Sequence, residues 1–268
     1  MNRPTMLAPR KVAPDVDALP SYLPVPAFGV LPVNAYLIGG PQPVLVDTGL
    51  AALRDEFLRA LGSLVALERL RWIWLTHTDP DHLGNLAAVL ERAPHARVVT
   101  TFLGLGKLGL FELPVDRAHL LNPGELLSIG DRQLLAVRPP VFDAPETTGI
   151  FDLKARIFFS ADCFGTLLDA PAETAAEVPP ERLRDGLVMW STVDAPWLHS
   201  VDAGAFGKAL DTVRRLDAGV VLGSHLPPAN GMTEGLLRDL AAARAAPPFE
   251  GPNQAEIERL LAAEPRSA

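Results

Sequence analysis

Cysteine is nearly absent from this 268-residue chain, in which Cys163 is the only one. A single cysteine excludes an internal disulfide and any zinc site built from several thiolates. No apolar run reaches the roughly 18 residues that a membrane-spanning helix needs, so we expect no membrane partner. The first 17 residues are rich in proline and charge and lack the apolar stretch of a signal peptide, so the expected compartment is the cytoplasm.

Positive charge is also in short supply. The chain carries 24 lysines and arginines against 32 aspartates and glutamates, a net charge of -8, and the basic residues are scattered. Nucleic-acid-binding domains gather positive charge on one face, so we expect no nucleic acid as a partner. Two catalytic motifs are absent as well: there is no Gly-x-Ser-x-Gly elbow, and the stretch 104–107 lacks the spacing and the Ser or Thr of a phosphate loop.

The chain does have a large apolar fraction, 48% of its residues, in alternating strand-like and helix-like patterns. Two apolar runs between residues 33 and 46 flank a Gly-Gly-Pro-Gln-Pro turn and predict a hairpin. Helical spacing follows at 51–68, and the pattern is mainly helical after residue 180. We therefore predict one α/β domain over residues 25–246, preceded by an irregular, proline-rich lead-in at 1–24 and followed by a tail at 247–268 with one short helix near 253–262.

A dense group of polar residues follows a short apolar strand at 72–75. Its four potential metal ligands lie within six residues: His77, Asp79, Asp81 and His82. Imidazole and carboxylate groups crowded at the end of a buried strand are unfavourable unless a cation offsets the cost, so the stretch predicts a divalent-metal site. The alternative is ordinary helix capping, in which Asp79 starts the following helix and Asp81 N-caps it.

Three other predicted strands also end on residues of the ligand type. Asp47 follows one strand, Asp162 another and His225 a third. The ends of strands in a layered α/β fold meet at one edge, where binding sites are usually found, so we expect one composite site. For Asp47, the alternative is an N-cap of the helix that starts near residue 51.

In this order, the residues resemble the metallo-β-lactamase superfamily and, within it, the oxygen-binding di-iron domain of flavodiiron proteins. Asp47-Thr48-Gly49 is similar to the superfamily's first motif, and His77-Thr78-Asp79-Pro80-Asp81-His82 to its second, with a carboxylate at position 79 as in the di-iron branch. The stretch 158–165 is similar to the one that carries the branch's bridging aspartate, and 223–225 to the segment of its last histidine. The resemblance implies a four-layer αββα metallo-β-lactamase sandwich.

The resemblance also implies two metal positions joined by a bridging carboxylate. The ligands it implies are His77, Asp79 and Asp143 for the first position, Asp81, His82 and His225 for the second, and Asp162 for the bridge. Asp143 is a departure, because the branch has a histidine there. Asp47 would orient a ligand histidine through a hydrogen bond. Outside the motifs, His199 lies between two predicted helices and is a candidate for lining the pocket.

Two chemistries fit such a site. In the favoured one, iron binds or reduces O2 or NO. The electrons would come from a separate partner, because no flavodoxin-like, FMN-binding domain is expected after residue 268. Oxygen-rich ligation favours iron, with zinc or manganese as alternatives. In the other, a metal-bound hydroxide attacks an ester, lactone, thioester or phosphodiester. Asp81 and Asp162 are the expected catalytic residues in both. A third interpretation is a degenerate member that only binds metal or a ligand. Flavodiiron proteins work as dimers, so the resemblance allows for a homodimer.

Overall fold

The computed structural model describes residues 3–263, which form two β-sheets and the helices around them. The strands of the first sheet are β1 (Thr5–Met6), β2 (Arg10–Ala13), β3 (Val16–Val25), β4 (Gly29–Ile38), β5 (Val44–Val46), β6 (Trp72–Trp74), β7 (Arg97–Thr100) and β8 (Ala118–Leu120). Those of the second are β9 (Leu126–Ser128), β10 (Gln133–Val137), β11 (Gly149–Asp152), β12 (Ile157–Phe159), β13 (Val220–Leu222) and β14 (Ala229–Asn230).

Eight α-helices and four short 3-10 helices are found in the same residues. The α-helices are α1 (Arg54–Leu64), α2 (Pro80–Leu83), α3 (Leu86–Arg92), α4 (Phe102–Leu110), α5 (Pro180–Asp194), α6 (Ala203–Leu216), α7 (Thr233–Ala243) and α8 (Gln254–Ala263). The 3-10 helices are η1 (Ala51–Leu53), η2 (Leu67–Arg69), η3 (Ala175–Glu177) and η4 (Leu198–Ser200).

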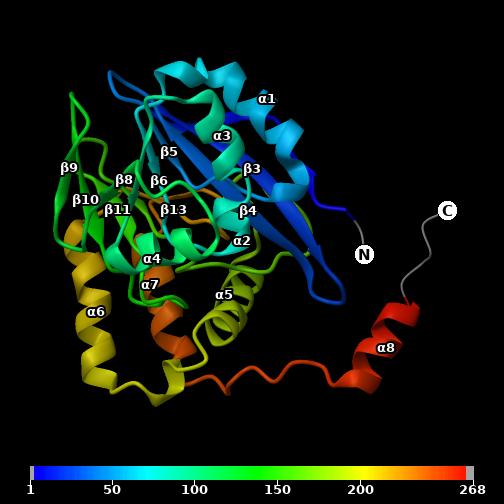
Figure 1. Cartoon of the computed structure of the whole chain (residues 1–268). Coiled ribbons are helices and arrows are strands. Elements are labelled where there is room, and N and C mark those ends of the chain that lie inside the picture. The colour runs from blue at the N-terminus through cyan, green and yellow to red at the C-terminus, as the bar shows by residue number, and fades with distance from the viewer. Residues whose placement is uncertain (1–2, 264–268) are drawn as a thin grey trace.

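The two sheets lie face to face, and helices cover both outer faces (Figure 1). The first sheet has the strand order β1-β3-β4-β5-β6-β7-β8, with β2 as an eighth strand paired to β3. The second has the order β14-β13-β12-β11-β10-β9. The predicted αββα sandwich is therefore confirmed.

Three apolar clusters separate the four layers. Tyr36, Trp74 and Phe159 belong to the cluster between the sheets. A second cluster packs α1, α3 and α4 onto the outer face of the first sheet, and a third packs α5, α6 and α7 onto the second sheet. Both sheets are thus covered on both faces, which is why their central strands are short, continuous apolar runs.

The arrangement of the strands determines where the polar residues meet. β5, β6 and β7 are parallel in the first sheet, as are β12 and β13 in the second. Parallel neighbours end at the same edge of a sheet, where ligands of α/β folds usually bind. The residues directly after β5, β6, β12 and β13 are therefore brought to one edge of the sandwich.

The irregular lead-in predicted for residues 1–24 is wrong. β3 pairs with β4 through ten residues, from Val16 opposite Ile38 to Val25 opposite Gly29. The prolines that suggested irregular chain are tolerated because proline costs a strand only the donor it lacks. The other side of β3 meets only the short strands β1 and β2, so Pro20 and Pro24 leave few ladder bonds unmade.

The C-terminal segment contains the helix expected near residues 253–262, observed as α8. In Figure 1 this helix lies apart from the sandwich, at the end of an extended stretch that follows α7. None of the helices within residues 3–263 is long and apolar enough to cross a membrane.

Candidate metal centre

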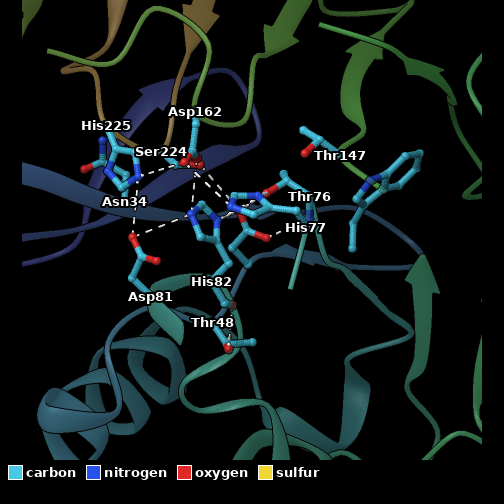
Figure 2. Close-up of polar contacts among 12 residues, drawn as sticks. Asn34, Thr48, Thr76, His77, Asp81, His82, Thr147, Asp162, Ser224 and His225 are labelled. Carbon is cyan, nitrogen blue, oxygen red and sulfur yellow. Dashed lines mark hydrogen bonds and ion pairs between the residues drawn. The ribbon is translucent and has the colours of Figure 1, made fainter. Parts of the chain in front are cut away.

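The polar residues at the strand ends converge on the carboxylate of Asp162. Its Oδ2 lies 3.6 Å from Nε2 of His77 and 3.2 Å from Nε2 of His225, and its Oδ1 lies 3.2 Å from Nε2 of His82. Figure 2 shows the three imidazoles around this carboxylate, two of them from the segment 77–82 and the third from the loop after β13. Asp162 thus occupies the position of a group shared between two sides of one site.

The remaining predicted ligands lie on either side of Asp162. On one side, Oδ2 of Asp81 is 3.6 Å from Nε2 of His82 and 3.4 Å from Nε2 of His225. On the other, Asp79 and Asp143 form a group with His77 in which potential ligand atoms lie within 4.8 Å of one another. All seven residues predicted as ligands are therefore brought together.

Each histidine has its other ring nitrogen engaged by the protein. Nδ1 of His225 donates to the carbonyl of Pro32 at 2.7 Å, and Nδ1 of His82 donates to Oδ2 of Asp47 at 2.9 Å. Nδ1 of His77 lies 3.2 Å from the hydroxyl of Thr76, which itself donates to Asp47 at 2.8 Å and so can accept from the ring. Nε2 is therefore the free nitrogen of all three rings, as metal ligation requires.

Several atoms at the centre of the site lack a hydrogen-bond partner. Within residues 3–263, Nε2 of His77, Nε2 of His82 and Oδ1 of Asp162 are buried and make no hydrogen bond, although the last two lie 3.2 Å apart. Leaving a buried polar atom unpaired costs about 1–3 kcal/mol, and more for a charged group. A cation held among these atoms would give each of them a partner, so the residues fit a metal.

The helix-capping alternatives do not account for these side chains. Asp79 occupies the N-cap position of α2, but its side chain makes no capping hydrogen bond, and Asp81 lies inside that helix. Asp47 precedes η1 by several residues, and Leu50 is that helix's N-cap. Asp47 instead accepts hydrogen bonds from the backbone N–H and the hydroxyl of Thr76 and from His82.

A close approach of two loops fixes the position of the motif that contains His82. A Cβ atom on Gly84 would lie 2.5 Å from both the nitrogen of Ala51 and the carbonyl oxygen of Gly49, so only glycine fits there. Thr48 and Asn85 join the same loops, because the amide of Asn85 donates to the carbonyl of Thr48 at 2.7 Å. The first and second sequence motifs are therefore locked together.

Comparison with known proteins agrees with this geometry. Residues 31–225 match the model of a family described as "ODP family beta lactamase". The chain belongs to this family. Relatives of this ODP-family chain include a putative diflavin flavoprotein A 2 from Nostoc sp., 34% identical over 49% of this chain and 23% of that protein. An anaerobic nitric oxide reductase flavorubredoxin from Pectobacterium atrosepticum is 28% identical over 49% of this chain and 26% of its own length.

Solved structures of flavodiiron proteins share the fold of this ODP-family chain. A flavo di-iron protein mutant from Thermotoga maritima has a TM-score of 0.80 at 21% identity, covering 92% of this chain and 63% of the other. The rubredoxin oxygen:oxidoreductase of Desulfovibrio gigas has a TM-score of 0.78 at 18% identity, covering 89% and 62%. The matches thus span about a quarter of the two curated relatives and less than two thirds of these solved chains.

The charges in the site of this family member shift the pKa values of its residues strongly. Burial lowers the pKa of His225 and His82, but the surrounding carboxylates, Asp162 above all, raise them to about 9 for His225 and well above the usual value for His82. Burial raises the pKa of Asp162, and the three histidines outweigh it and hold that pKa well below its usual range. Without metal, His82 and His225 therefore keep protons that a metal ion must displace.

The two outer carboxylates differ in their ionisation. Burial raises the pKa of Asp81, but His82 and His225 lower it by more, so the pKa of Asp81 lies below its usual value. Burial and the charge of Asp143 raise the pKa of Asp79 although His77 lowers it. The His77 side of the site is thus poorer in positive charge than the His225 side.

Three residues near the site escaped the sequence analysis. Asp194, the last residue of α5, forms a group with Asp143 and Asp162 that has the spacing of metal ligands. Burial, and then the charges of Asp162 and Asp143, raise its pKa to about 8. The ring of Trp190 lies 4.7 Å from that of His225, and the amide of Asn34 donates to the carbonyls at both ends of the 223–226 loop.

The signals for these residues were weak or absent. An aspartate in the last turn of a helix is disfavoured by the helix dipole, and this is the one signal that could have drawn attention to Asp194. His199, by contrast, was a candidate for lining the pocket, and it lies exposed in η4 and belongs to none of the ligand groups.

Proposed function

We propose that this chain holds two iron ions at the candidate metal centre, and that the centre binds and reduces O2 or NO with electrons from a donor outside residues 3–263. The observation that carries the proposal is the placement of Asp162 between three histidines whose Nδ1 atoms are all engaged. A shared carboxylate with a free Nε2 on each side of it suits two ions rather than one.

The ligands follow from the groups that the side chains form. The first ion takes His77, Asp79 and Asp143, the second takes Asp81, His82 and His225, and Asp162 bridges them; the first two sets coincide with two of the potential ligand groups. The four aspartates bring a charge of -4, which two divalent ions neutralise. Because four of the seven ligands are carboxylates, iron is favoured over zinc, with manganese as a further alternative.

A pair of ferrous ions would supply electrons and open coordination positions for O2 or NO. The chain's own residues hold the ligands in place: Asp47 fixes the ring of His82, and the carbonyl of Pro32 fixes that of His225. Trp190 packs against His225 and shields that side from water. Asp143 is an exposed residue, so the His77 side of the site lies closer to solvent.

The names of the relatives support redox chemistry. One curated relative is a nitric oxide reductase, and one structural neighbour is a rubredoxin:oxygen oxidoreductase. Hydrolysis by a metal-bound hydroxide is not favoured, because the reported relatives and solved neighbours are flavoproteins or flavodiiron proteins.

The proposal is tested by analysing protein purified without added metal. We expect two irons per chain and, after anaerobic reduction, an absorption change and consumption of O2 or NO on exposure to either gas. Asp185→Asn, an exposed change on α5, is a matched control that should behave as the wild type. Stoichiometric zinc together with turnover of a generic ester or phosphodiester would contradict the proposal.

A further inference from the structure

The end of α5 brings a fifth aspartate to the metal centre. Asp194 is the last residue of this helix, and its carboxylate forms a group with Asp143 and Asp162 in which potential ligand atoms lie within 4.8 Å of one another. Oδ2 of Asp194 is buried and has no hydrogen-bond partner within residues 3–263. Asp162 is only 5% exposed, and its Oδ1 is likewise unpaired.

This position is unfavourable for a carboxylate in the absence of a cation. The C-terminal end of a helix carries partial negative charge, so it repels an acidic side chain in the last turn. The charges that act on its carboxyl include those of two further carboxylates, Asp162 and Asp143, which outweigh the opposing charges of His225 and His82. Among the ion pairs within residues 3–263, none joins Asp194 to a lysine or arginine that could balance its charge. A metal ion held among these carboxylates would supply a charge that favours the ionised form of Asp194.

We propose that Asp194 is an additional ligand of the metal ion held by His77, Asp79 and Asp143. The inference rests on the proposed function, because it takes a dinuclear centre as given. Asp194 reaches this ion and not the other, because its group shares Asp143 with the first ligand set and contains no member of the second. The chain thereby gains a carboxylate beside Asp143, the residue that differs from the histidine of the di-iron branch.

The extra ligand makes the two metal positions chemically different. The first would be bound by one imidazole and four carboxylates, counting the bridge, and the second by two imidazoles and two carboxylates. Carboxylate ligands favour hard ions such as manganese and iron over softer ones. Five aspartates carry a charge of -5, one more than two divalent ions neutralise, so the first position should favour the more highly charged oxidised ion.

A cysteine substitution tests direct ligation. Asp194→Cys, loaded with two equivalents of Co2+, should show a near-ultraviolet absorption band from thiolate-to-cobalt charge transfer, because the thiolate would replace the carboxylate on the metal. Wild-type protein is the blank, since its only cysteine, Cys163, is fully buried and burial raises its pKa beyond the usual range. Asp185→Cys is the matched control, because Asp185 lies on the same helix and is exposed.

The possible outcomes distinguish an error in the role of Asp194 from an error in the dinuclear centre. Two bound cobalt ions without the band in Asp194→Cys would overturn the role of Asp194 and leave the dinuclear centre standing. Fewer than two cobalt ions in the wild type would overturn the centre and the inference together.

Asp194→Asn provides a second measurement that does not depend on the thiolate. We expect the affinity for one of two Mn2+ ions to fall at least about 10-fold in a titration. The metal-free protein should unfold at the same or a higher denaturant concentration, because the change removes a buried carboxyl that has no hydrogen-bond partner within residues 3–263. A merely structural role would instead lower the stability of the metal-free protein, and unchanged affinity for both ions would also overturn the inference.

Discussion

The two halves of the candidate metal centre differ in how firmly the fold holds them. His82 and His225 are each 1% exposed, and each donates a short hydrogen bond to an acceptor in the sandwich. In the other half only His77 is buried, while Asp79 is half-buried and Asp143 is exposed. The side chain of Asp143 accepts a single hydrogen bond, from Thr147 at 3.5 Å. The half that contains His82 and His225 is therefore fixed by the fold, whereas the half that contains Asp79 and Asp143 is less constrained.

The difference follows from the elements that carry the ligands. His225 is hydrogen-bonded to Pro32 in β4, and His82 to Asp47 in the loop after β5; both strands belong to the first sheet. Asp143 lies in the irregular segment between β10 and β11, where no ladder of hydrogen bonds fixes the backbone. We therefore expect the second position to bind its metal first and to release it last.

Removing a ligand from the fixed half should have the largest effect. In His225→Gln we expect the second ion to bind more than about 100-fold more weakly, because loss of a ligand exceeds the 10–100-fold cost of disturbing an outer-shell partner. Metal analysis after dialysis against a chelator should find one ion per chain. His199→Gln, which changes an exposed histidine, should retain two. Two ions in both variants would show that His225 is not a ligand.

Asp47→Asn should weaken the fixed half from outside the ligand set. The amide cannot offer charged oxygens to both Thr76 and His82, so the affinity for the second ion should fall about 10–100-fold. The metal-free protein should also lose about 1–3 kcal/mol of unfolding free energy, measured by urea denaturation, because buried donors lose their charged acceptor. Unchanged affinity for the second ion would contradict the role of Asp47 in holding His82.

The stability of the metal-free protein should fall as the pH rises from about 6.5 to 9. His225 has a pKa raised to about 9, so its contribution is complete below the unfolded value of 6.5 and is lost as the pH approaches 9. Asp194 acts in the same direction, since its carboxyl stays protonated up to about pH 8 in the folded chain but ionises near 4 when unfolded. At about 1.4 kcal/mol per pKa unit, the loss should be on the order of 3–5 kcal/mol.

Urea denaturation in the presence of a chelator, repeated across this pH range, measures the effect. With metal bound the trend should reverse, because the ion displaces these protons and binds more tightly as the pH rises. Metal-free protein that gains stability between pH 6.5 and 9 would mean that His225 and Asp194 are not held in their protonated forms.

Asp143→Ala should have the smallest effect on the centre. Asp143 is exposed and weakly hydrogen-bonded, so we expect the first ion to bind several-fold to about 10-fold more weakly, with no measurable change in stability of the metal-free protein. Asp143→His, the residue of the di-iron branch, should restore the affinity and raise the reduction potential. Metal titration decides: unchanged affinity in Asp143→Ala would remove Asp143 from the first ligand set.

The local pattern of the sequence located the strand ends, and the resemblance to the di-iron branch supplied the four-layer sandwich and the set of seven ligand candidates, Asp143 among them. Apolar runs that stop at Asp47, His77, Asp162 and His225 mark strand ends, and strand ends gather at one edge. The pairing of β3 with β4 was missed because proline normally breaks strands, and only the neighbours of β3 make Pro20 and Pro24 acceptable.

The place of Asp194 in the site could not be predicted from the sequence for a different reason. Its position in the site depends on how α5 packs on the second sheet, and that packing is set by residues far away in the chain. The same holds for Asn34, which contacts the loop of His225 across nearly 190 residues of sequence. Contacts of this kind leave no periodicity or motif in either segment.

The hydrogen bonds between β4 and the loop of His225 can form only late in the synthesis of the chain. Pro32 and Asn34 leave the ribosome early, and their partners at 223–226 leave late. Synthesis proceeds at roughly 5–20 residues per second, so the early strands wait on the order of 10 seconds or more for the last ligand. The proposed second metal position therefore cannot be complete until the chain is nearly finished, since His225 is its last ligand in sequence.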